Sequence, residues 1–100
     1  MSTAHMITLL SAGDIAVNLW RAEIATKDAR HAYHRKINEF EAKHGRIEAR
    51  INPDKPEHAE LIAYTKLRFD AYQTAKRKAY NLRRRLNTAC QKAARLAAEK

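Results

Sequence analysis

Apolar residues recur at steps of three and four along most of the chain, which is the spacing of one face of an α-helix. The first series lies between residues 13 and 51 and comprises Ile15, Leu19, Ala22, Thr26, Ala29, Tyr33, Ile37, Phe40, His44, Ile47 and Ile51. The second lies between residues 57 and 98 and comprises Ile62, Thr65, Phe69, Tyr72, Ala75, Ala79, Leu82, Leu86, Cys90, Ala93 and Ala97. The pattern predicts two long helices.

A short polar break, INPDKPEH over residues 51–58, separates the two series. Pro53 disfavours a helical Asn52, and Pro56 suits the first turn of a new helix. A short connection between long helices favours an antiparallel hairpin, so we expect an all-α, coiled-coil-like helical hairpin. We expect one domain over residues 1–100, divided into a short apolar N-terminal segment (1–12), a first helix (13–51), a linker (52–56) and a basic second helix (57–98).

Gly45 leaves two interpretations of the first helix open. Glycine is the usual residue just beyond a helix end, so the helix ends at His44 in one interpretation. In the other, which we favour, the helix continues through Gly45 to Ile51, because the apolar spacing persists in Ile47 and Ile51.

The first helix carries more apolar residues than a single seam can bury, among them Val17, Trp20 and Ile24. Two helices alone cover only one face of each other. We therefore expect a homo-oligomer, for instance a dimer that forms a four-helix bundle, or a stable complex with a partner. The alternative is that the N-terminal apolar residues Met6–Leu10 fold back and cover the remaining surface.

The net charge of +9 is confined to the last third of the chain. Residues 1–65 contain nine Lys or Arg and nine Asp or Glu, whereas residues 66–100 contain eleven Lys or Arg and two acids, so that 11 − 2 = +9. A charge asymmetry of this kind favours an anionic partner.

Steps of 100° per residue around the second helix place several cations together, opposite its apolar series. This candidate binding ridge consists of Lys66, Arg77, Arg84, Arg85, Lys92 and Arg95. Lys76 and Arg83 fall beside the apolar series instead, where they can lie along aromatic rings or reach acids of the first helix. A solvated helix face normally mixes acids with bases, and this ridge does not, although a plain solvated face remains the alternative.

The ridge predicts a non-catalytic protein that binds the nucleic-acid backbone largely without sequence preference. The alternative is a small helical adaptor or inhibitor that docks on an acidic groove of a larger protein, which itself handles nucleic acid in some such cases. Membrane binding is disfavoured, because the apolar face of the second helix is rich in alanine.

Other chemistry finds little support in the sequence. His31 and His34 are three residues apart, but a zinc site needs three or four ligands. Cys90 falls in the second apolar series and is expected to be buried rather than nucleophilic. We therefore expect no enzyme activity, no metal and no cofactor. A single cysteine and the lack of an apolar run of about 20 residues suit a cytoplasmic protein.

Overall fold

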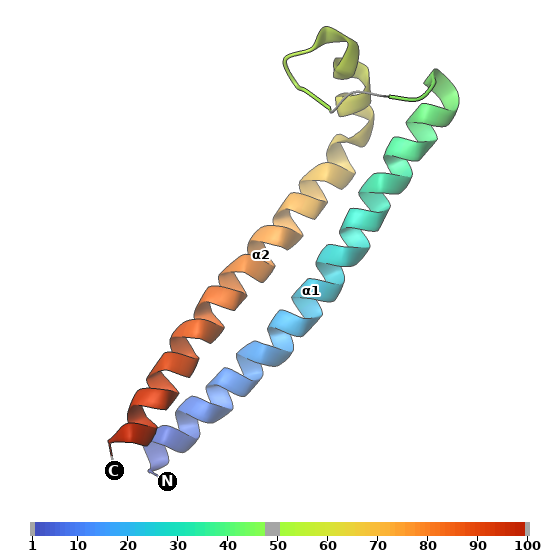
Figure 1. Cartoon of the computed structure of the whole chain (residues 1–100). Helices are drawn as coiled ribbons and strands as arrows, with labels where there is room; N and C mark the ends of the chain where they lie inside the picture. The colour runs from blue at the N-terminus through green and yellow to red at the C-terminus, as the bar shows by residue number, and fades with distance from the viewer. Residues whose placement is uncertain (1, 48–50, 100) are drawn as a thin grey trace.

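The computed structural model describes residues 2–47 and 51–99. Two long helices, α1 (Thr3–His44) and α2 (Ala59–Ala98), run antiparallel, and a 3-10 turn, η1 (Pro56–His58), precedes α2. The helices lie side by side along their length, with both termini at one end and the connection at the other (Figure 1). The molecule measures 65 × 22 × 18 Å. The predicted all-α helical hairpin is confirmed.

The seam between the helices follows a seven-residue repeat. The inward positions of α1, buried or half-buried, alternate in steps of four and three and are Thr8, Ala12, Ile15, Leu19, Ala22, Thr26, Ala29, Tyr33, Lys36 and Phe40. Those of α2 are Leu61, Thr65, Tyr72, Ala75, Ala79, Leu82, Leu86, Ala89, Ala93 and Leu96. A repeat of 3.5 residues per turn keeps one stripe of each helix against the other and is the repeat of a left-handed coiled coil.

Alanine and threonine occupy half of the positions of this seam. Its central cluster pairs Leu19 and Ala22 of α1 with Ala79 and Leu82 of α2. Buried threonines are also accommodated, because the hydroxyl of Thr65 donates to the carbonyl oxygen of Leu61 at 2.9 Å. The polar group therefore has its hydrogen bond inside its own helix.

α1 begins earlier than the sequence analysis predicted. We expected a separate segment over residues 1–12, but the helix starts at Thr3 and passes through Gly13 without a break. Ser2 caps it, since its hydroxyl oxygen accepts from the backbone N–H of His5 at 3.1 Å. The cap satisfies a backbone N–H of the first turn, which stabilises a helix that begins at Thr3 rather than at residue 13.

α1 also ends earlier, at His44, so the favoured continuous helix is wrong among the described residues. Gly45 has φ 95°, a left-handed conformation that glycine adopts without strain, and its N–H donates to the carbonyl oxygen of Glu41 at 2.8 Å. This arrangement satisfies a terminal carbonyl and turns the chain away. Residues 46, 47 and 51 are not helical, and residues 48–50 of the predicted helix lie outside the described residues.

The predicted seam of α2 drifts from the observed one. Cys90 is exposed, and Ala89 lies at the seam in its place. At the other end Leu61, only 1% exposed, is more deeply buried than Ile62. The predicted series departs from a strict seven-residue repeat at two places, with successive steps of three over Phe69, Tyr72 and Ala75 and of four over Leu82, Leu86 and Cys90. The observed seam keeps the seven-residue repeat.

A buried histidine holds the connection between the helices. His58 is 6% exposed, and its Nδ1 accepts from the backbone N–H of Asn52 at 2.8 Å. The side chain of Asn52 in turn accepts from the N–H of Asp54 at 3.0 Å, which closes a tight turn. The connection is thus organised by side chains as well as by Pro53 and Pro56.

The seam predicts where truncation destabilises the chain. Phe40→Ala is expected to lower the free energy of unfolding by about 3–5 kcal/mol and Leu61→Ala by about 2–5 kcal/mol, because each leaves a cavity in the seam. The matched control is Leu67→Ala, since Leu67 is 78% exposed. Denaturant unfolding monitored by circular dichroism measures all three. An equal loss of stability at position 67 would contradict the seam.

The histidine bond predicts a second pair of variants. His58→Ala removes the acceptor for the Asn52 N–H and is expected to destabilise the chain by about 1–3 kcal/mol. His58→Asn is expected to keep most of the stability. Oδ1 of asparagine and Nδ1 of histidine are both bonded to Cγ, so asparagine places an acceptor at the same distance along the side chain. Hydrogen exchange at the Asn52 amide should accelerate in the alanine variant alone. An Asn52 exchange rate in the alanine variant equal to that of the unaltered chain would show that the bond is unimportant.

Candidate functional site

Two adjoining grooves run along one side of the hairpin, near the C-terminal half of α2. The first is lined by Ile15, Asn81, Arg84, Arg85, Thr88, Ala89 and Lys92. The second is lined by Asn18, Arg21, Ala22, Ala25, Ala75, Lys78, Leu82 and Arg85. Arg85 lines both grooves and joins them. We call the five cations of these grooves the basic face: Arg21, Lys78, Arg84, Arg85 and Lys92.

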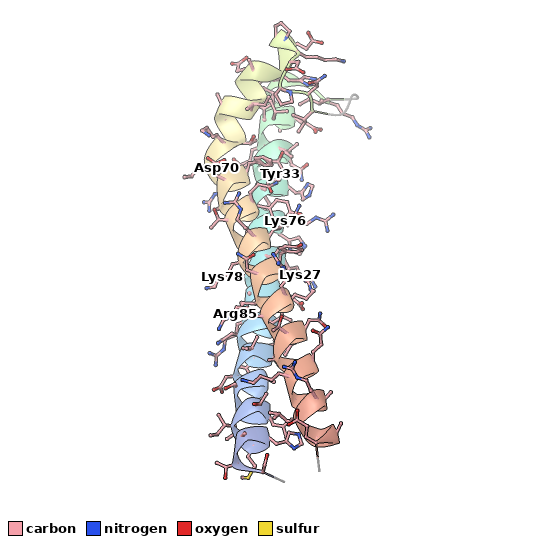
Figure 2. The ribbon with its side chains drawn as sticks, turned by 90° about the vertical axis from the view of Figure 1, so that its left-hand side faces the viewer. Lys27, Tyr33, Asp70, Lys76, Lys78 and Arg85 are labelled. Atoms are coloured by element: carbon pink, nitrogen blue, oxygen red, sulfur yellow. The ribbon has the colours of Figure 1, made fainter. Side chains whose placement is uncertain are left out.

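Heptad spacing positions the central row of this face. Lys78, Arg85 and Lys92 are seven residues apart, so in a coiled coil they fall on one line beside the seam. The rise of about 1.5 Å per residue separates neighbours in the row by roughly 10 Å. Lys78 and Arg85 project to the same side of the hairpin, whereas Lys27 and Lys76 project to the opposite side (Figure 2).

The cations of the basic face have no carboxylate among the residues that line the two grooves within the described chain. The ion pairs of the described residues involve other bases: Lys36 with Glu39 at 3.2 Å, Lys66 with Asp70 at 3.1 Å, and Arg83 with Glu23 at 3.3 Å. The positive potential of the basic face is therefore not neutralised locally, and such a surface attracts anions.

The structure brings together only part of the predicted ridge. Arg84, Arg85 and Lys92 share a groove with Ile15 of α1, so they border the hairpin seam rather than pointing wholly away from α1. Arg77 and Arg95 are exposed and line neither groove.

Lys66 lies elsewhere. It lines a separate groove together with Tyr33 and His34, close to the connection between the helices, and it is paired with Asp70. The eleven-residue spacings that aligned Lys66 with Arg77, and Arg84 with Arg95, suit a straight helix and not a 3.5-residue supercoil.

Sequence reasoning missed two members of the basic face, Lys78 and Arg21. The seven-residue spacing of Lys78, Arg85 and Lys92 was a usable signal for the first. No sequence signal identified Arg21, because only the hairpin brings it next to α2.

Aromatic rings near the cations are already in contact with other groups. The guanidinium of Arg84 lies 5.9 Å from the ring centre of Tyr80, and Nζ of Lys76 lies 5.2 Å from that of Tyr72. Arg83 reaches Glu23 of α1, as expected for a cation beside the apolar series. The groove linings include no aromatic side chain among the described residues, so these grooves offer no platform on which bases could stack.

Near the connection, Glu39 joins the two helices. Its Oε2 accepts from the hydroxyl of Tyr64 at 3.1 Å and lies 3.2 Å from Nζ of Lys36. The hydrogen bond from Lys36, with that from Tyr64, holds the pKa of Glu39 below its usual value. Partial burial raises the pKa of Tyr33.

Three further findings bear on function. The described residues contain no group of three or more His, Cys, Asp or Glu side chains placed to hold a metal ion. No helix among them has the combined length and apolar character required to cross a bilayer. Comparisons with protein-family models, curated proteins and solved structures find no match to this chain.

The Glu39 contacts predict a measurable titration. Because its pKa is lowered on folding, this carboxylate stabilises the hairpin above its unfolded pKa, and that stabilisation is lost as the pH falls through the folded pKa. Lys36→Met and Tyr64→Phe should each raise the pKa of Glu39 towards its ordinary value, measured by carboxyl NMR. Lys27→Met is the control and should leave it unchanged. No change in either of the first two variants would refute the assignment.

Proposed function

We propose that this chain is a non-catalytic binding protein that holds a nucleic-acid backbone against its basic face, largely without regard to base sequence. One observation carries the proposal: two adjoining grooves are lined by five Arg or Lys side chains and by no carboxylate among the described residues. The rest of the proposal follows from the chemistry of those side chains.

Phosphate is the anion that suits this arrangement. Arginine offers a planar fork of N–H donors that matches two phosphate oxygens, and lysine adds a point charge. The groove also presents Asn81, whose neutral amide can donate a hydrogen bond to phosphate or sugar oxygens. Each phosphate neutralised releases condensed counterions, which supplies affinity that does not depend on sequence.

The weak sequence preference follows from what surrounds the cations. Reading bases requires either free aromatic faces or polar side chains presented to base edges. Lys76 lies over the ring of Tyr72 and Arg84 over that of Tyr80, and neither ring lines a groove of the basic face. The row of Lys78, Arg85 and Lys92 is held on a long, continuous helix, which suits contact with a regular backbone.

The second candidate partner is an acidic protein surface, as for an adaptor or inhibitor. The same cations would steer such an encounter. The two candidates predict different binding to bare nucleic acid. If the partner is nucleic acid, the affinity falls with salt concentration, with a slope set by the number of phosphates bound. If the partner is an acidic protein, the chain binds bare nucleic acid only weakly.

The test replaces the central row of the basic face. Lys78→Gln, Arg85→Gln and Lys92→Gln together should weaken binding to duplex and single-stranded probes of unrelated sequence alike. The slope of log K against log salt should shrink by roughly 0.7–0.9 for each phosphate that the variant no longer neutralises. Glutamine retains high helix propensity, so the hairpin should persist by circular dichroism.

The matched control removes the same charge elsewhere, with Lys27→Gln, Lys55→Gln and Lys66→Gln. Fluorescence anisotropy over a salt series should show a markedly smaller decrease in affinity for this control. Equal decreases for the two triples would mean that only net charge matters and would reject the basic face as a site. Negligible binding of every probe by the unaltered chain would reject the nucleic-acid proposal and favour the acidic protein.

A further inference from the structure

α1 carries a second apolar stripe that the hairpin does not cover. We call it the outer stripe, and it consists of Met6, Leu10, Gly13, Val17, Trp20 and Ile24, at successive steps of four and three. Leu10 is 70% exposed and Trp20 62% exposed. The spacing equals that of the hairpin seam, so the outer stripe also runs straight along a supercoiled helix.

The outer stripe faces almost directly away from α2. At about 100° per residue it lies roughly 160° around α1 from the seam residues Leu19 and Ala22. Contiguous exposed apolar surface of this kind marks an interaction site. Its heptad spacing specifies the shape of the occupant, which is another long helix lying along α1.

We propose that the outer stripe binds the outer stripe of a second copy of this chain, with the two α1 helices antiparallel. The charges beside the stripe favour this occupant and this orientation. Asp14 and Arg21 lie along the same edge of the stripe, seven residues apart and opposite in sign. In an antiparallel pair, each edge of the stripe lies beside the equivalent edge of the second copy. Asp14 therefore lies next to Arg21 of the second copy, and the two-fold symmetry makes this pair occur twice.

A parallel pair would place opposite edges together and would bring Glu23 next to Asp28 of the second copy, two like charges. The antiparallel register that pairs Asp14 with Arg21 also matches side-chain sizes. It sets Trp20 opposite Val17 and Ile24 opposite Gly13, so each large residue meets a smaller one. A side chain built at Gly13 would meet no atom within 4 Å, so this position is open to a neighbour.

This arrangement also keeps the excess positive charge of the two copies apart. Because the outer stripe is opposite the seam, the two α1 helices lie in the middle and each α2 lies at an outer edge. The basic rows are then separated by more than the Debye length of about 8 Å at physiological salt, which limits their repulsion. A closed four-helix bundle would instead bring the two α2 helices close together.

Sedimentation velocity of the full chain from low to high micromolar concentration tests the dimer. The unaltered chain should dimerise, and Val17→Gln with Trp20→Gln should raise the dimer dissociation constant more than about tenfold. Both side chains are exposed, so the variant should keep its helicity and melting temperature. Leu67→Gln, an exposed leucine of α2, is the matched control and should leave the dimer intact.

Charge exchange tests the orientation. Asp14→Arg should weaken the dimer, and Asp14→Arg with Arg21→Asp should restore it. In a Cys90→Ala background, Gly13→Cys with Ile24→Cys should form an interchain disulfide under oxidation, whereas Ile24→Cys alone should not, because the two copies of residue 24 lie far apart. A disulfide through residue 24 alone would indicate a parallel pair and overturn the proposal. A chain that stays monomeric at every concentration would also overturn the proposal. If that monomer bound phosphatidylserine vesicles through its outer stripe, the occupant would be a membrane surface and not a second copy.

Discussion

The narrow seam between α1 and α2 is the constraint on which the rest of the structure depends. Alanine and threonine occupy half of its positions, and Leu19, Phe40, Leu61 and Leu82 are the larger residues among those that are buried. Small side chains let the helices approach closely but bury only a narrow stripe of each. The hairpin therefore uses its apolar contacts to hold two helices in register and leaves the remaining faces of both exposed.

The seam also decides which charged residues become neighbours. Its 3.5-residue period aligns side chains that are seven residues apart, so Lys78, Arg85 and Lys92 form a row. Lys66 does not fall on this row. Cations on the other flank of the seam are neutralised or stacked, as Arg83 is by Glu23 and Lys76 is on Tyr72. The supercoil thus separates a flank of neutralised or stacked cations from a flank whose grooves contain no acid among the described residues.

The two exposed faces have different chemistry because they belong to different helices. α2 presents most of the cations of the basic face, and α1 presents the apolar outer stripe on the side away from α2. The hairpin keeps these surfaces apart, so the proposed anionic partner and the proposed second copy would contact different residues, with one exception. Arg21 is the exception, since it lines a groove of the basic face and borders the outer stripe.

The existence of two helices, their antiparallel order and the concentration of charge in α2 were all predictable from the sequence, because each follows from local spacing, from Pro53 and Pro56, or from counting. The ends of α1 were not predictable. The cap at Ser2 and the left-handed conformation of Gly45 decide them, and neither end coincides with an end of the apolar spacing. The inward side of α2 was predictable only in part, because Ala89 and Cys90 both fit the helical spacing after Leu86 and packing against α1 decides between them. For the same reason the grooves that join Arg21 to Lys78 and Arg85 were decided by tertiary structure alone, which brings together residues that lie far apart along the chain.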